Sequence, residues 1–278
     1  MLSAAGLYLQ ILSHPALSRL CGRGADARIP GPLLRAAIAA YVRLYGVDLA
    51  EAADPVTSFR TFDEFFTRRL RSGARTIDPR ADVIASPCDA RIYGCGRVPE
   101  DGRLEQIKGR TYALEDLLGD ARWAETFRGG FQATLYLSPA MYHRVHWPAD
   151  GRVVRWRRIP GRLYPVNALA LRHVDRLFAV NRRVVIHLDG EGFGPIALVM
   201  VGATNVGRIE LAFDGPCAGE DGGVYDPKAA IAARRGDELG AFHLGSTVVL
   251  LAADPRLAWT GPTAGDLVKM GQALWRRE

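Results

Sequence analysis

The segment RVVIHLDGEGFGPIALVMV, residues 183–201, decides the fold class. Two runs of β-branched and apolar residues, 183–188 and 196–201, flank a stretch rich in glycine, aspartate and proline. Short runs of this kind, bounded by turn residues, are typical of β-strands. Three further runs share the pattern: 131–137, 206–213 and 247–252. The chain after about residue 80 is therefore predicted to form a mostly antiparallel, β-rich core domain.

The first seventy residues carry helical patterns instead. Apolar residues recur at helical spacing over 2–12, and a second helix is predicted from Pro32 to about residue 46. A third begins at Thr61, where the spacing to Glu64 is that of a capping box. Such apolar stripes pack on a core or lie on a membrane. Three in succession, followed by arginines, favour a membrane-surface module.

The predicted fold class is thus α+β, with N-terminal amphipathic helices followed by the β-rich core. Residues 1–75 are expected to form a helical, membrane-associating segment, and residues 76–278 the catalytic domain. One helix is predicted inside that domain at 113–118, where Gly119 is placed to end it.

The net charge indicates the kind of partner, and the cysteines indicate the compartment. The chain has 36 Lys and Arg against 30 Asp and Glu, a formal net charge of +6, which suits nucleic acid, an acidic membrane or a phosphorylated substrate. The four cysteines show no zinc-ligand spacing, and a reducing compartment is the simpler interpretation. The apolar N-terminus is interrupted well before the roughly 20 residues that span a bilayer, and it lacks the basic start of a secretory signal.

Three segments supply the groups of an activated nucleophile: SPCDARI (86–92), YLSPAMYHRVHWPADGRV (136–153) and FHLGSTVVLLAA (242–253). They contain a carboxylate at Asp89, imidazoles at His143 and His146, and a hydroxyl at Ser246. A hydroxyl, an imidazole and a carboxylate are the members of a catalytic triad. The usual signatures of hydrolases and nucleotide sites, GxSxG, GxxxxGKT and GxGxxG, are missing.

Each motif also has a structural interpretation. Gly-Ser-Thr is usually a turn that enters a strand, and an aspartate before a strand most often forms a turn. HxxH can be a metal pair, but no third ligand with suitable spacing follows, so no metal is expected. The remaining histidines are interpreted as structural: His14, His173, His187 and His243.

Taken in order, these segments resemble the phosphatidylserine decarboxylase family. The resemblance covers about residues 60–252, and LGST together with YHRVHWPADG is its most specific part. Other matching segments are FDEFFTRRL (62–70), KGRTYALEDLLG (108–119), PGRLYPVN (160–167), LFAVNRR (177–183) and FGPIALVMVGATNVGRIEL (193–211). The chain departs from the family at Ala90, where glycine usually follows the aspartate.

The resemblance implies a proenzyme that cuts itself between Gly245 and Ser246, giving chains 1–245 and 246–278. Gly245 has no Cβ, so it can adopt a strained backbone and expose its carbonyl to attack. The Ser246 hydroxyl attacks that carbonyl to form an ester. β-Elimination and hydrolysis then leave a pyruvoyl group, the covalent pyruvate cofactor, and release ammonia.

Residue roles also follow from the resemblance. His146 would take the proton from Ser246, Asp89 would orient His146, and His143 would act in the decarboxylation step. The pyruvoyl ketone would condense with the substrate amine and withdraw electrons from the departing carboxylate. Ala90 leaves the carboxylate of Asp89 in place.

The implied activity is decarboxylation of phosphatidylserine to phosphatidylethanolamine and CO2, in phospholipid biosynthesis. The enzyme would be a peripheral protein on the cytoplasmic face of the cell membrane, bound to phosphatidylserine in an anionic bilayer. A homodimer is compatible with this, and no nucleic acid is expected. In RVVRWRRIPGRLYP, residues 152–165, the cations Arg155, Arg157 and Arg158 and the interfacial aromatic Trp156 would add membrane contacts.

Three alternatives stay open. In the first, the chain is a relative that uses the same pyruvoyl group to decarboxylate a soluble amino acid. The N-terminal helices and residues 152–165, as lipid-facing parts, are the features that would distinguish a lipid substrate from a soluble one. A Ser-His-Asp hydrolase without self-processing would be active as an uncut chain. A basic binding module would have no chemistry at all.

Overall fold

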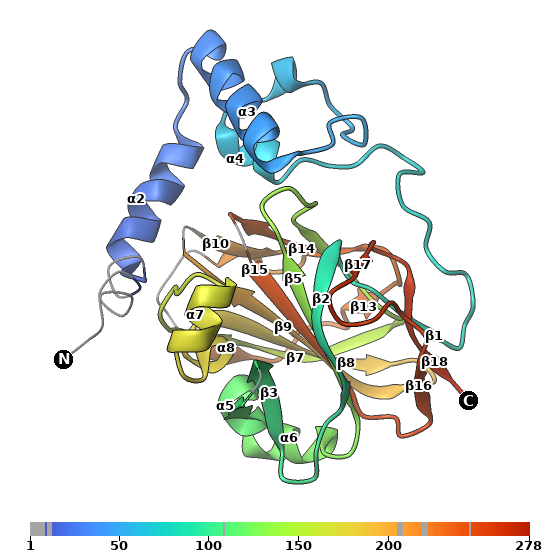
Figure 1. Ribbon diagram of the computed structural model, residues 1–278. Helices are drawn as coiled ribbons and strands as arrows, with labels where there is room; N and C mark the ends of the chain where they lie inside the picture. The colour runs from blue at the N-terminus through green and yellow to red at the C-terminus, as the bar shows by residue number, and fades with distance from the viewer. Residues whose placement is uncertain (1–8, 10–12, 108, 205–207, 218–221, 245) are drawn as a thin grey trace, which may run out of the picture.

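The computed structural model describes residues 9, 13–107, 109–204, 208–217, 222–244 and 246–278. In these residues the centre of the protein is an antiparallel sheet of nine strands, ordered β12-β7-β8-β9-β15-β5-β2-β17 with β13 beside β7 (Figure 1). The strands are β2 (Ala90–Arg97), β5 (Phe131–Leu137), β7 (Gly151–Ile159), β8 (Arg183–Gly190), β9 (Gly194–Gly202), β12 (Gly223–Tyr225), β13 (Ala232–Ala233), β15 (Ser246–Ala252) and β17 (Leu267–Val268). Both faces of β8, β9 and β15 are covered, which explains their nearly continuous apolar sequences.

Three smaller sheets complete the β structure of the described chain, in the orders β11-β10-β14-β6, β1-β18-β16 and β3-β4. Their strands are β1 (Val83–Ala85), β3 (Arg103–Ile107), β4 (Arg110–Ala113), β6 (Arg144–His146), β10 (Arg208–Leu211), β11 (Gly215–Cys217), β14 (Glu238–His243), β16 (Leu257–Trp259) and β18 (Ala273–Arg277). The α+β prediction is confirmed. Each of the five predicted runs forms a strand, and β5 has the predicted bounds; of the run 206–213, residues 206 and 207 lie outside the described residues.

The core contains more helix than predicted. The expected helix is α5 (Leu114–Leu118), and Gly119 ends it in the left-handed conformation at φ +65°. Three further helices were missed: α6 (Ala121–Phe127), α7 (Ala168–His173) and α8 (Leu177–Val180). They are too short for an apolar period to stand out, although the N-cap side chains of Asp120 and Asn167 were readable signals.

The N-terminal helices are α2 (Pro15–Asp26), α3 (Gly31–Tyr45), the 3-10 turn η1 (Val56–Ser58) and α4 (Phe62–Phe66). They lie beside the β core at the end where the loop after β5 emerges (Figure 1). The apolar stripe of α3 packs on α4, because Leu34, Ile38 and Phe65 form one buried cluster. The helix expected over 2–12 lies almost entirely outside the described residues.

Two membrane predictions require correction. The apolar stripe of the third predicted helix, which begins at Thr61, is not a free face for the membrane: α4 ends at Phe66, and both Phe65 and Phe66 are buried. Trp156 is not an interfacial aromatic either. It lies in β7, only 7% exposed, and its indole N–H donates to Asp214 at 2.7 Å. The neighbouring arginines form ion pairs with aspartates: Arg155 with Asp226, Arg157 with Asp120 and Arg158 with Asp214.

Candidate active site

The predicted site residues lie together at one end of the strands of the large sheet. Ser246 opens β15 and pairs with Leu137, at the end of β5, and with Gly202, at the end of β9. Arg91 of β2 pairs with Tyr136 on the other side of β5, so the start of β2 stands level with Leu137. With strands about 4.8 Å apart, the Ser246 backbone lies roughly 10 Å from the start of β2, which Asp89 immediately precedes. The segment with both histidines follows β5 at the same end of the strands.

The predicted cleavage bond lies where β14 passes into β15. Gly245 lies outside the described residues, and Ser246 is described by its backbone. The residue before them, Leu244, has φ +78°. A branched side chain rarely adopts this left-handed conformation, which persists only where the surrounding structure imposes it.

His143 is buried in the loop between β5 and β6. Its Nδ1 lies 2.8 Å from the carbonyl oxygen of Met141, so this nitrogen donates and Nε2 carries the lone pair. The ring packs on Phe66 with centroids 4.0 Å apart. Burial lowers the pKa of His143 to about 3, so the ring is neutral near pH 7. Among the side chains that the structure describes, none forms a hydrogen bond with Nε2.

His146 is the last residue of β6. Its Nδ1 donates to the carbonyl oxygen of Gly236 at 2.8 Å, and its Nε2 lies 3.0 Å from the Tyr142 hydroxyl. The carbonyl fixes the tautomer, so Nε2 is the basic atom. Burial lowers the pKa of His146 and favours the neutral ring.

Asp89 is held by the N-terminal segment and by the C-terminal part of the chain. Its carboxylate accepts from Arg75 through both oxygens and from the backbone N–H of Met270 at 2.9 Å. Arg75 also donates to Glu51 at 2.7 Å, and Lys269 donates to the other oxygen of Glu51 at 3.0 Å. The network therefore connects both predicted chains, 1–245 and 246–278.

The structure brings Asp89 and His146 close without joining their side chains. The backbone N–H of His146 donates to the carbonyl of Pro87 at 2.7 Å, so β6 runs beside the segment that leads to Asp89. In the described hydrogen bonds, both nitrogens of His146 have other partners, and Gly236 holds the ring where Asp89 was expected to do so. The orienting role of Asp89 stays a prediction.

Helix α3 and the residues that follow α4 contact the loop that carries His143. The Tyr41 hydroxyl donates to the carbonyl of Pro139 at 2.9 Å, and Arg68 donates to that of Ala140 at 3.3 Å. Arg144, in turn, donates to the carbonyl of Thr67 at 2.8 Å. The loop is therefore positioned by residues far away in the sequence, which residue types alone do not predict.

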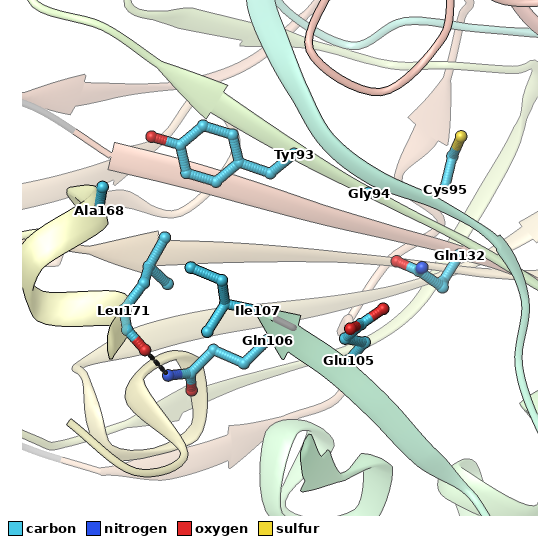
Figure 2. Close-up of a pocket in the computed structure, with 9 residues that line it drawn as sticks. All are labelled: Tyr93, Gly94, Cys95, Glu105, Gln106, Ile107, Gln132, Ala168 and Leu171. Carbon is cyan, nitrogen blue, oxygen red and sulfur yellow. Dashed lines mark hydrogen bonds between the residues drawn. The ribbon is translucent and has the colours of Figure 1, made fainter. Parts of the chain in front are cut away.

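A cavity of about 360 Å³ lies elsewhere, between β2, β3 and α7 (Figure 2). Its lining residues are Tyr93, Gly94, Cys95, Glu105, Gln106, Ile107, Gln132, Ala168 and Leu171. Asp89, His143 and His146 are not among them. The polar groups of Gln106 serve the fold, because its side chain bonds to Leu171, Val174 and Leu177.

Comparison with known proteins gives one consistent result. The family model for phosphatidylserine decarboxylase matches residues 62–276. A phosphatidylserine decarboxylase proenzyme of Anaeromyxobacter sp. (strain K) is 44% identical over 277 residues, covering 96% of this chain and 95% of the relative. Proteins of the same name from Vibrio cholerae serotype O1 and Myxococcus xanthus are 44% and 40% identical; each comparison covers 96% of this chain, and 96% and 95% of the respective relative.

Proposed function

The chain belongs to the phosphatidylserine decarboxylase family and is an enzyme that decarboxylates phosphatidylserine to phosphatidylethanolamine, and we propose that it makes its pyruvoyl cofactor from its own Ser246. The observation that carries this proposal is the position of Ser246. It is the first residue of β15 and lies at the end of the sheet where β2 begins. The segment with His143 and His146 follows β5 at the same end of the strands.

Self-cleavage would proceed through an ester. The Ser246 oxygen attacks the carbonyl carbon of Gly245 while a base takes its proton, and the carbon–nitrogen bond breaks as the nitrogen is protonated. Loss of the Ser246 Cα proton expels the Gly245 carboxylate and leaves dehydroalanine. Its imine tautomer takes up one water and releases ammonia. The products are chain 1–245 with a free carboxylate and chain 246–278 headed by a pyruvoyl group.

The local backbone is compatible with such a bond. Leu244 has an unfavourable φ of +78°, and Ser246 is paired on both sides by β5 and β9. Because strands on both sides already fix the backbone of Ser246, bringing the nucleophile to a neighbouring carbonyl would cost little entropy.

The two histidines offer different chemistry. We assign proton removal from Ser246 to His146, whose neutral ring has a fixed tautomer and a basic Nε2 that contacts Tyr142. We assign His143 to the decarboxylation step. Its buried Nε2 carries a lone pair and has no partner among the described side chains, so it is available for proton transfer in that step. When present, that pyruvoyl group supplies the electron-withdrawing carbonyl.

One observation favours the reverse assignment. The N–H of Phe242 donates to the carbonyl of His143 at 2.9 Å, whereas His146 pairs with Glu238. Along β14, His143 therefore lies nearer to Ser246 than His146 does. The two assignments differ in which histidine is needed for cleavage.

Membrane contact belongs to the same proposal. Within the part of the chain that the structure describes, no helix is both long and apolar enough to cross a bilayer. We propose that residues 1–75 form the membrane-associating segment and 76–278 the catalytic domain. Exposed Leu33, Leu44 and Tyr45 of α3 support peripheral binding, and the exposed Arg35 and Arg43 would face anionic headgroups.

The Ser246→Ala variant tests the cofactor proposal. It lacks the nucleophile, so it should remain a single chain without decarboxylase activity on phosphatidylserine vesicles. Ser58→Ala, in the exposed turn η1, is the matched control and should cleave and turn over normally. An active Ser246→Ala enzyme would refute the assignment of the cofactor to Ser246.

A further inference from the structure

His243 joins three elements immediately before the predicted cleavage bond. It ends β14, two residues before Gly245, and is 8% exposed. Its Nδ1 lies 2.7 Å from Oδ2 of Asp63 in α4, and its Nε2 lies 3.1 Å from Oε2 of Glu210 in β10. An ionised carboxylate can only accept, so the ring donates to whichever carboxylate it bonds. The side chain thereby connects the helical segment to the strand that leads into the cleavage motif.

Arg208 extends this connection to a second helix. One of its terminal nitrogens lies 3.5 Å from Oδ2 of Asp63 and 3.0 Å from Nδ1 of His243, and the other lies 3.7 Å from Oδ2 of Asp26 in α2. Three carboxylates thus surround one guanidinium and one imidazole. This cluster is separate from the groups that contact His143, His146 and Asp89.

The cluster holds the chain just before Leu244, and the large sheet holds the chain from Ser246 onward. On the C-terminal side, β15 is paired with both β5 and β9 from Ser246 onward. On the N-terminal side, β14 is paired with β10 and β6, and the His243 side chain adds its bonds at the last position. Leu244, with φ +78°, stands between these two anchors.

We propose that His243, held by Asp63 and Glu210, is a positioning residue for self-cleavage at Gly245–Ser246. This inference rests on the proposed function and adds to it a role for helix α4. A residue in a rarely adopted conformation relaxes unless its neighbours prevent it. Without the His243 contacts, Leu244 can return to extended backbone and move the following carbonyl away from its nucleophile. Misplacement by about 1 Å can reduce a reaction rate about 100-fold.

The test follows cleavage of newly made chains. Full-length protein is labelled during cell-free synthesis, and the loss of the uncut 30.3 kDa chain is timed on gels. His243→Ala should cleave about 10- to 100-fold more slowly than the wild type. Asp63→Asn should also be slower, because it removes the nearer carboxylate. The matched controls are His173→Ala, in α7, and Asp189→Asn, in an exposed ion pair; both should cleave at the wild-type rate.

Two measurements separate positioning from general destabilisation. His243→Asn, whose side-chain amide can still donate to Asp63 from the end of β14, should cleave faster than His243→Ala, because it keeps a contact that anchors Leu244. In a Ser246→Ala background, which stays uncut, the thermal midpoints with and without His243→Ala are compared. Slow cleavage of His243→Ala with partial recovery in His243→Asn, at a midpoint far above the assay temperature, supports the proposal.

The negative outcomes are distinct. Wild-type cleavage rates in both His243→Ala and Asp63→Asn would overturn the positioning role and leave self-cleavage standing. Slow cleavage accompanied by a midpoint near the assay temperature would also overturn it, because destabilisation would then explain the loss. Equally slow cleavage of His243→Ala and His243→Asn would overturn it as well, because a retained contact to Asp63 would then have no effect. An uncut but active wild-type chain would instead refute the proposed function itself.

Discussion

Replacing Arg75 with alanine should destabilise the protein and disturb the site together. The Arg75 side chain is 5% exposed and is bonded to Asp89 and Glu51. Removing one partner of a buried ion pair typically costs about 3–5 kcal/mol, because a buried charge is left uncompensated. Asp89 keeps the Met270 N–H, so the lower end of that range applies.

The pKa of Glu51 gives a second measure of the same network. Hydrogen bonding to Arg75, ahead of Lys269, lowers this pKa from 4.5 to about 2. At about 1.4 kcal/mol per pKa unit, the change from 4.5 to about 2 corresponds to at most about 3.5 kcal/mol, which is shared between the two partners and reduced by solvent at this partly exposed side chain. Because the folded-state pKa is depressed, this stability is fully present above pH 4.5 and is lost as the pH falls towards 2.

Urea unfolding of uncut protein in a Ser246→Ala background measures both effects. Arg75→Ala should lose about 3 kcal/mol near pH 7 and show a weaker loss of stability between pH 4.5 and about 2 than its parent. Arg152→Ala, which breaks an exposed pair with Asp189, should cost less than about 1 kcal/mol. Equal costs for the two substitutions would refute the reasoning, as would an unchanged acid profile in Arg75→Ala.

Three further predictions concern the histidines, Asp89 and the membrane. His143→Ala should cleave yet decarboxylate poorly, whereas His146→Ala should remain uncut; gels and product assays separate the two, and an uncut His143→Ala would favour the reverse assignment. Asp89→Asn should slow cleavage about 10²–10⁴-fold if Asp89 acts through the base, and a normal time course would remove it from the machinery. Leu33→Glu combined with Leu44→Glu should weaken co-sedimentation with anionic vesicles; unchanged binding would place the membrane contact elsewhere.

The strands could be predicted because burial on both faces leaves a continuous apolar run between turn residues. The segment 131–137 therefore gave the bounds of β5, and Gly119 marked the end of α5. Helices such as α6, with seven residues, are shorter than two full turns and produce no clear period. For α4, helical spacing showed an apolar face but not what covers it: Phe66 packs on His143 rather than on lipid.

The groups of the candidate site were predictable only as residue types. Asp89, His143, His146 and Ser246 stand in distinctive motifs, whereas their partners are set by tertiary structure. The Gly236 carbonyl that fixes the tautomer of His146 is a backbone group, and any residue at that position provides one. Arg75 is one arginine among many, and only the folded chain places it against Asp89.

The mass spectrum of the intact, purified protein tests the central claim most directly. We expect two chains, 1–245 and 246–278, in place of one of 30.3 kDa. The small chain should be lighter, by the mass of one ammonia, than a fragment that begins with an unmodified serine. A single 30.3 kDa chain that decarboxylates phosphatidylserine would contradict the account, as would a small chain that begins with serine in a fully active preparation.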